Sequence, residues 1–153
     1  MIVVSDTSPL TALLTIGQAD LLVRLFGEVI IPEAVEAELL RSHSELPSWL
    51  KVRSVEKTAQ ALSYAKTVDM GEAEAIALAQ ELKADHLLMD ERKGRRLATA
   101  QGVSVVGLVG VILIAKREGF IGSARTLLLR LEQESGIYLS ENVRETALRS
   151  VGE

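Results

Sequence analysis

Apolar residues occur along the chain in two patterns. Short runs predict buried strands at residues 2–5, 29–31, 86–89 and 103–106, and a shorter strand at 52–55. Longer stretches carry an apolar residue every three or four positions, which predicts helices at residues 8–16, 19–26, 32–40, 59–66, 72–82, 92–100, 109–117, 123–134 and 141–149. Strands and helices that alternate in this way are typical of a three-layer α/β/α sandwich with a mainly parallel sheet.

The chain shows no internal repeat, low-complexity segment or dividing linker, so its 153 residues are expected to form one domain. Apolar residues make up 48% of the chain, which excludes disorder, and aromatic residues only 3%, so the core must be aliphatic. Because cysteine is absent, disulfides, thiolate nucleophiles and cysteine-ligated metal sites are excluded. The two histidines, His43 and His86, are expected to be structural.

The net charge of −4 predicts no polyanionic partner, so contact with a nucleic acid has to come from a local basic patch. No N-terminal targeting segment is recognisable. Residues 97–115 carry no charge, but Gln101 and Gly102 interrupt them, which favours a strand between two helices over a membrane span. We therefore expect a soluble, cytoplasmic protein.

Two aspartates directly follow predicted strands, Asp6 after residues 2–5 and Asp90 after residues 86–89. In a parallel α/β sheet, ligands bind beyond the carboxyl ends of the strands, so both carboxylates are expected at the same edge. A divalent cation would relieve their mutual repulsion, and oxygen-only ligands suit Mg²⁺ or Mn²⁺. The alternative is that each aspartate only caps the next helix or forms an Asx turn.

The segment 69–77 adds two glutamates at the start of a helix. At about 100° per residue, Glu72 lies on the apolar face of this helix, whereas Glu74 lies opposite and should face solvent. A carboxylate on a buried face requires a partner, so Glu72 is the stronger candidate for a metal ligand. A capping box with Asp69 is the alternative for Glu72, and a loosened first turn would let Glu74 reach a second metal.

The predicted helix 32–40 carries Glu36 and Glu38, which flank its buried side almost equally. Helical periodicity does not choose between them. For either glutamate, a solvated helix face is the alternative to a role in a site.

These segments, taken in order, carry a resemblance to a known family. Asp6-Thr7-Ser8, an acid in the helix 32–40, the Gly-Glu-Ala-Glu-Ala segment at 71–75 and Leu-Leu-Met-Asp at 87–90 resemble the PIN-domain nucleases. Within that family the chain is most similar to the VapC-like toxin branch. The resemblance covers nearly the whole chain and implies a PIN-like fold. Residues 1–122 would be the nuclease domain, and residues 123–153 two C-terminal helices packed on it.

The resemblance also implies which residues act. The catalytic and metal-binding acids would be Asp6, Glu38, Glu72 and Asp90, with Thr7 or Ser8 as a supporting hydroxyl. Glu38 is chosen because it precedes a Leu-Leu pair, as the family's second acid does. Glu72 departs from the pattern, since VapC-like toxins carry aspartate there, and Glu91 beside Asp90 leaves the fourth ligand ambiguous.

By the same resemblance, the activity would be Mg²⁺- or Mn²⁺-dependent hydrolysis of RNA phosphodiesters by an endoribonuclease. An antitoxin protein and a homodimer are further implied partners. A basic run begins two residues after Asp90 and is placed to engage RNA backbone phosphates, although a solvated helix face is its alternative; it comprises Arg92, Lys93, Arg95 and Arg96.

Two other functions compete with this one. Phosphoryl transfer through an aspartyl intermediate on Asp6, as in haloacid-dehalogenase-like or receiver domains, requires a second acid adjacent to it or two residues later. Ser5 and Ser8 occupy those positions. A PIN-like module that binds RNA or a protein partner without catalysis is the other candidate, and the presence of all four acids argues against it.

Overall fold

The computed structural model describes residues 1–153 and centres on a sheet of five parallel strands. Their order is β3-β2-β1-β4-β5, with bounds β1 Val3–Ser5, β2 Val29–Pro32, β3 Leu50–Arg53, β4 His86–Leu88 and β5 Val105–Val106. The first strand is central, since Val3 is in register with Val29 on one side and His86 on the other. The predicted α/β/α sandwich is confirmed, and its sheet is entirely parallel.

Nine helices connect and follow the strands, close to where the sequence predicts them. They are α1 Thr7–Thr15, α2 Asp20–Phe26, α3 Glu33–Leu40, α4 Thr58–Tyr64, α5 Met70–Glu81, α6 Arg92–Ala100, α7 Leu108–Arg117, α8 Ala124–Glu134 and α9 Glu141–Arg149.

The largest displacement from the predicted elements concerns β3. It occupies Leu50–Arg53 rather than residues 52–55, because its backbone pairs with β2 from Leu50 onward. Leu50 is its one buried side chain, and the next three are exposed. An edge strand with one buried residue carries almost no hydrophobic pattern, so pairing alone sets its position.

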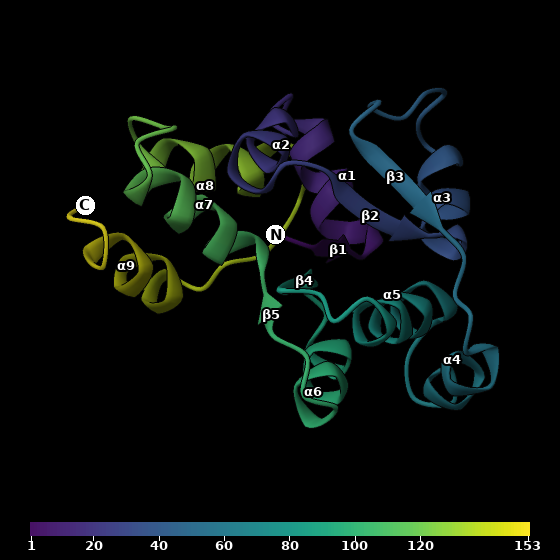
Figure 1. Ribbon diagram of the computed structural model, residues 1–153. Coiled ribbons are helices and arrows are strands. Elements are labelled where there is room, and N and C mark those ends of the chain that lie inside the picture. The colour runs from purple at the N-terminus through teal and green to yellow at the C-terminus, as the bar shows by residue number, and fades with distance from the viewer.

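The sheet separates two hydrophobic layers, as successive side chains of a strand point to opposite faces. Helices α4, α5 and α6 lie on one side of the strands, and α1, α2, α7 and α8 lie on the other (Figure 1). The side chains that face the first group are Val4, Leu87 and Met89. Those that face the second group, with which Leu148 of α9 also packs, are Val3, Val29, Ile31 and Leu88.

The C-terminal helices α8 and α9 share this second hydrophobic cluster, to which they contribute Leu127, Leu128, Leu131 and Leu148. Residues 97–115, which are without charge, form the end of α6, the strand β5 and most of α7. None of the helices has both the length and the apolar character needed to cross a membrane.

Candidate functional site

Asp6 lies where the central strand ends. Its backbone N–H donates to the carbonyl oxygen of Leu88 at 2.9 Å, so the residue continues the pairing of β1 with β4 before α1 begins. Its side chain is 5% exposed. The carboxylate is therefore held at the carboxyl edge of the sheet, the edge at which parallel α/β proteins bind ligands.

Beside Asp6 is a cleft of about 660 Å³ in which acidic and hydroxyl groups predominate. Its acidic residues come from four separate parts of the chain, and one basic residue, Lys93, joins them. The acidic and hydroxyl residues that line it are Asp6, Thr7, Ser8, Thr11, Thr15, Glu38, Thr67, Asp69, Glu72, Glu91 and Ser135. Three predicted acids, Asp6, Glu38 and Glu72, and both predicted hydroxyl residues are thus brought together.

Asp69 and Glu72 form the first turn of α5. The Asp69 carboxylate accepts a hydrogen bond from the backbone N–H of Glu72 at 2.8 Å, so Asp69 is the N-cap of this helix. Glu72 is only 6% exposed, and its Oε2 is buried without a hydrogen-bond partner. Burial, and then the nearby Asp69 carboxylate, raise the pKa of Glu72 to about 8.

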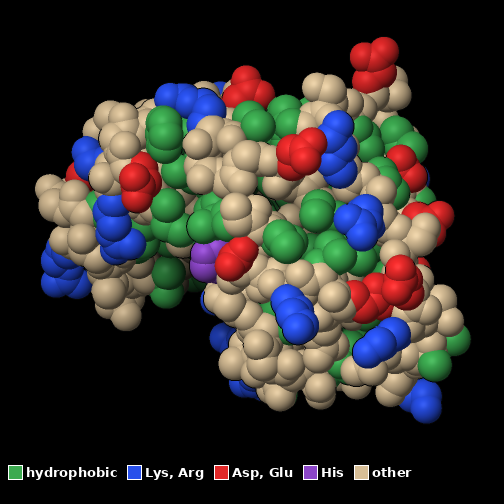
Figure 2. Space-filling model, viewed as in Figure 1, with side chains coloured by type: hydrophobic (Ala, Val, Ile, Leu, Met, Phe, Trp, Pro, Cys, Tyr) green, Lys and Arg blue, Asp and Glu red, His purple; other side chains and the backbone are tan.

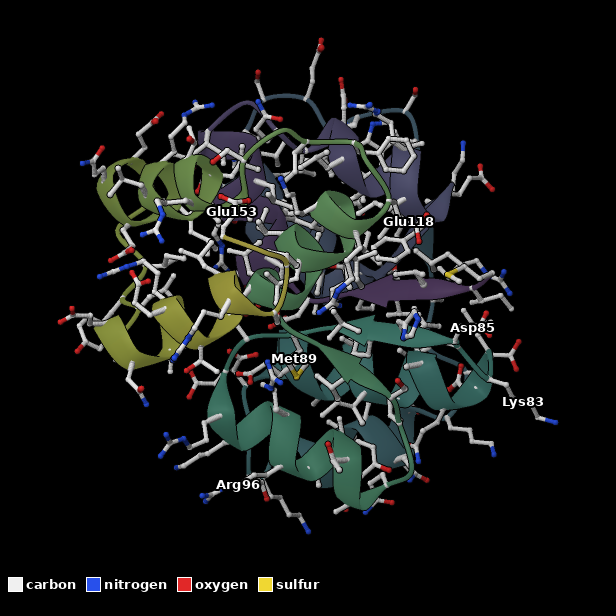
Figure 3. The ribbon with its side chains drawn as sticks, turned by 90° about the vertical axis from the view of Figure 1, so that its left-hand side faces the viewer. Lys83, Asp85, Met89, Arg96, Glu118 and Glu153 are labelled. Carbon is white, nitrogen blue, oxygen red and sulfur yellow. The ribbon has the colours of Figure 1, made fainter.

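Gly94 and Gly71 leave room for the carboxylates of Glu72 and Glu38. A Cβ at position 94 would lie 2.5 Å from Oε2 of Glu72 and equally close to the sulfur of Met89, which lies between the sheet and α6 (Figure 3). A Cβ on Gly71 would collide with the Glu38 carboxylate. A larger residue at position 94 or 71 would therefore take up space that the Glu72 or Glu38 carboxylate occupies.

Negative charge is concentrated around Asp6. Burial raises the pKa of its carboxyl group from 3.8 to about 7. The charges of Asp69, Glu38 and Asp90 act in the same direction. At neutral pH the site thus binds either a proton or a cation more readily than a solvated carboxylate would.

The other predicted residues lie around the cleft or away from it. Asp90 lies beside it, where its Oδ1 accepts a hydrogen bond from the backbone N–H of Leu108 at 2.7 Å. Glu38 lines the cleft and Glu36 does not. The expectation that Glu74 faces solvent is wrong: it is half-buried and accepts a hydrogen bond from the N–H of Ala34 at 3.0 Å, because α5 packs against α3.

The basic run on α6 is divided between two surfaces. Lys93 lines the acidic cleft, whereas Arg92, Arg95 and Arg96 line a separate cavity next to Asp90. Asp69 also lines the cleft, although its sequence position predicted only a helix cap. Its position directly before Met-Gly-Glu was the one sequence feature that could have indicated a site residue. Only the fold brings it close to Asp6.

The donor set can be compared with what a divalent cation requires. As the side chains stand, no three acidic or histidine residues converge closely enough to hold one ion. The carboxylate and hydroxyl groups of the cleft offer only oxygen ligands, however, the Asp6 carboxyl has a raised pKa, and Glu72 Oε2 and Thr7 Oγ1 are buried without partners. The chemistry therefore fits a hard cation such as Mg²⁺ or Mn²⁺, provided that at least one carboxylate turns toward the others.

A parallel sheet between helical layers, with acidic side chains collected at its carboxyl edge, defines the class: a single-domain α/β protein with an acidic site. The chain belongs to the PIN domain family, because a family model described as a PIN domain matches residues 2–153. PIN domains are generally nucleases, so the general class of the chain is that of the hydrolases. No curated protein and no solved structure matches the chain. The family match extends through α8 and α9.

Proposed function

We propose that this protein is a divalent-metal-dependent endoribonuclease that hydrolyses RNA phosphodiesters in the acidic cleft. The observation that carries the proposal is the buried Asp6 carboxyl, whose pKa is raised to about 7 among the charges of Asp69, Glu38 and Asp90. A group in this state gains most from a neighbouring cation. Membership of a family of nucleases supports the same reaction class.

Asp6, Glu38 and Glu72 would hold Mg²⁺ or Mn²⁺, with Asp90 and Asp69 beside them. When bound, the cation supplies Lewis-acid activation of water and neutralises charge on the phosphodiester. The chain's own contribution is to orient the RNA. The ammonium group of Lys93 lines the same cleft and would attract the phosphate, while Thr7 and Ser8 offer hydroxyls at the start of α1.

The resemblance to VapC-like toxins is the basis of a finer proposal. On that basis the protein would be the toxin of a toxin–antitoxin pair, acting in the cytoplasm as a homodimer. Its antitoxin would cover the acidic cleft.

A second candidate function is a PIN-like module that binds RNA or a protein partner without cleaving it. The observation in its favour is that no three carboxylates converge on one point in the structure. Glu72 also supports it, because its longer side chain replaces the aspartate of the VapC-like toxins.

The experiment that separates the two is cleavage of end-labelled single-stranded and hairpin RNAs with Mg²⁺, with Mn²⁺, and with EDTA. Asp6→Asn keeps the side-chain shape and removes the charge, so cleavage should fall by at least about 100-fold, since even residues that only support metal ligands cost 10- to 100-fold. Asp20→Asn, at the exposed start of α2, is the matched control.

Circular dichroism of both variants establishes that each is folded. Cleavage that disappears in EDTA and in Asp6→Asn, but survives in Asp20→Asn, supports the nuclease. Equal cleavage by Asp6→Asn overturns the site. No cleavage by any of the proteins, together with no Mn²⁺ binding in calorimetry, makes the binding module the better account.

A further inference from the structure

Three cavities adjoin one another and run from the acidic cleft to the outer face of α6. The acidic cleft shares Ser8, Glu91 and Ile137 with a second cavity of about 410 Å³. That second cavity shares Asp90 and Tyr138 with a third, of about 910 Å³. A strand of polymer that leaves the cleft on this side therefore has a continuous path along the surface.

The third cavity is called the basic groove here. It lies between α6 on one side and the α8–α9 connection and α9 on the other. The residues that line it are Asp90, Arg92, Arg95, Arg96, Thr99, Ala100, Tyr138 and Val143. Figure 2 shows the surface hollowed between the part formed by α9 and the part formed by α6, with basic side chains at the α6 margin. Arg96 projects from α6 into solvent (Figure 3).

The arginines of the basic groove form no salt bridge, although the charge of Arg95 acts on the Asp90 carboxyl and counteracts the rise in its pKa. Arg92, Arg95 and Arg96 are exposed, and none of them forms a salt bridge. The contrast with the C-terminal helices is clear, because Arg125, Arg130 and Arg144 each pair with a glutamate. Positions i, i+3 and i+4 of a helix share one face, so the three arginine side chains leave α6 on the same face.

Tyr138 stands across the groove from these arginines. It lies in the α8–α9 connection, residues 135–140, and is 87% exposed, the most exposed of the large hydrophobic side chains. The chain has only five aromatic residues, Trp49, Tyr64, Tyr138, Phe26 and Phe120, and leaving one of them open to solvent costs packing. An exposed ring and three exposed arginines in one groove match a nucleotide, which has a π-face and a phosphate.

We propose that the basic groove binds the single-stranded segment of RNA that leaves the acidic cleft, with one unpaired base stacked on Tyr138. Arginine side chains of α6 hold the phosphates on either side of that base. Since the bases of a duplex are stacked on one another and leave no face free, a duplex of the same sequence binds more weakly. That this RNA continues from the acidic cleft rests on the proposed function, whereas binding in the groove does not.

The test measures the affinity of Asp6→Asn protein, which should leave RNA intact, for a fluorescent 12-nucleotide single-stranded RNA, the matching duplex, and a DNA of the same sequence. Tyr138→Ala in this background should weaken single-strand binding by about 5- to 100-fold, the range that base stacking contributes. Tyr138→Phe keeps the ring and should stay within about 2-fold of the parent. Because Tyr138 is exposed, these changes leave the fold intact.

A second readout reports stacking directly. A 2-aminopurine placed in the RNA loses fluorescence when it stacks on an aromatic ring, so its quenching should disappear in Tyr138→Ala and persist in Tyr138→Phe. Unchanged affinity and quenching in Tyr138→Ala overturn the proposal, and so does a Tyr138→Phe variant as weak as Tyr138→Ala. Tighter binding of the DNA overturns the assignment to RNA. A polyglutamate peptide that displaces the RNA and is insensitive to Tyr138 points instead to an acidic protein partner.

The arginines are tested by salt dependence. Arg96→Gln should reduce the slope of log affinity against log salt concentration by about 0.7, the value for one phosphate contact on a single strand. Arg53→Gln is the matched control, because Arg53 is exposed on β3, at the opposite edge of the sheet from β5. Equal slopes for the two variants overturn the groove.

These outcomes separate the two proposals. Metal-dependent cleavage by the wild-type protein, combined with Tyr138-independent binding, leaves the nuclease standing and removes the basic groove. Tyr138-dependent binding without cleavage under any condition leaves the groove standing and removes the nuclease.

Discussion

Asp6 combines two properties that both disfavour its charged form in a metal-free protein. Its carboxylate is almost fully buried, and the charges of Asp69, Glu38 and Asp90 surround it. Both effects favour the protonated form, so the folded protein holds a proton that the unfolded chain releases at a much lower pH. The site therefore costs stability at neutral pH unless a proton or a cation is bound.

This cost predicts how stability depends on pH in EDTA. Between about pH 4 and pH 7 the folded state binds more protons at Asp6 than the unfolded state, so the free energy of unfolding falls as pH rises. With a pKa that moves from 3.8 to about 7, the decrease is at most about 4 kcal/mol at 1.36 kcal/mol per unit. Asp6→Asn should make the profile shallower, leaving the part of the decrease that comes from Glu72, whose pKa is raised to about 8, and should exceed the wild type at pH 8. Urea denaturation at pH 5, 6.5 and 8 measures this.

Asp20→Asn serves as the control, because Asp20 is an exposed residue. It should reproduce the wild-type profile. A wild-type protein that becomes more stable between pH 5 and pH 8 would contradict the burial of the Asp6 charge.

At the scale of elements, Glu74 connects two helices. It projects from α5 and accepts the backbone N–H of Ala34, in the first turn of α3, at 3.0 Å. The first turn of a helix has unpaired N–H groups and a partial positive charge, so a carboxylate there stabilises it. Glu74 thus supports the helix that carries Glu38.

We expect Glu74→Ala to lower the free energy of unfolding by about 1 kcal/mol, the usual cost of losing a cap. Glu74→Gln keeps an acceptor oxygen and should lose less than half of that. Neither variant should change Mn²⁺ affinity in calorimetry. If Glu74→Gln is as stable as the wild type but binds Mn²⁺ at least 10-fold more weakly, Glu74 is a second-metal ligand rather than a cap.

Across the whole molecule, Glu153 ties the end of the chain to the start of α8. Its carboxylate accepts from the backbone N–H groups of Ala124 at 2.7 Å and Arg125 at 3.1 Å, and it lies 3.4 Å from Lys116 Nζ. Figure 3 places Glu153 against α7 and α8. These contacts hold the end of the chain, which follows α9, against α7 and α8.

Glu153→Ala should therefore lower the free energy of unfolding by about 1 kcal/mol. Glu118→Ala, an exposed residue at the end of α7, should change it by less than about 0.5 kcal/mol. Thermal denaturation followed by circular dichroism compares the two. If the two variants have equal melting temperatures, the contacts of Glu153 with the start of α8 contribute nothing to stability.

The fold was largely predictable from the sequence because its signals are local. Buried strands and amphipathic helices repeat with periods of two and 3.6 residues, and capping residues such as Ser140 mark helix starts. Asp6 and Asp90 were predictable as neighbours for a related reason, since each follows closely after a strand of a parallel sheet. The edge strand β3 escaped this logic because it buries only Leu50.

The sequence by itself determined the elements, the parallel sheet and the acidic carboxyl edge, since each follows from the order and spacing of residues along the chain. Only the tertiary structure decided that Glu38 rather than Glu36 lines the cleft, that Asp69 joins it and that Glu74 does not. Only the structure placed Tyr138 opposite the arginines of α6, about 40 positions earlier in the chain. Burial, the proximity of charges and shared cavities depend on distances between segments that are remote in the sequence. Local periodicity does not contain those distances, because it reflects only residues that are close along the chain.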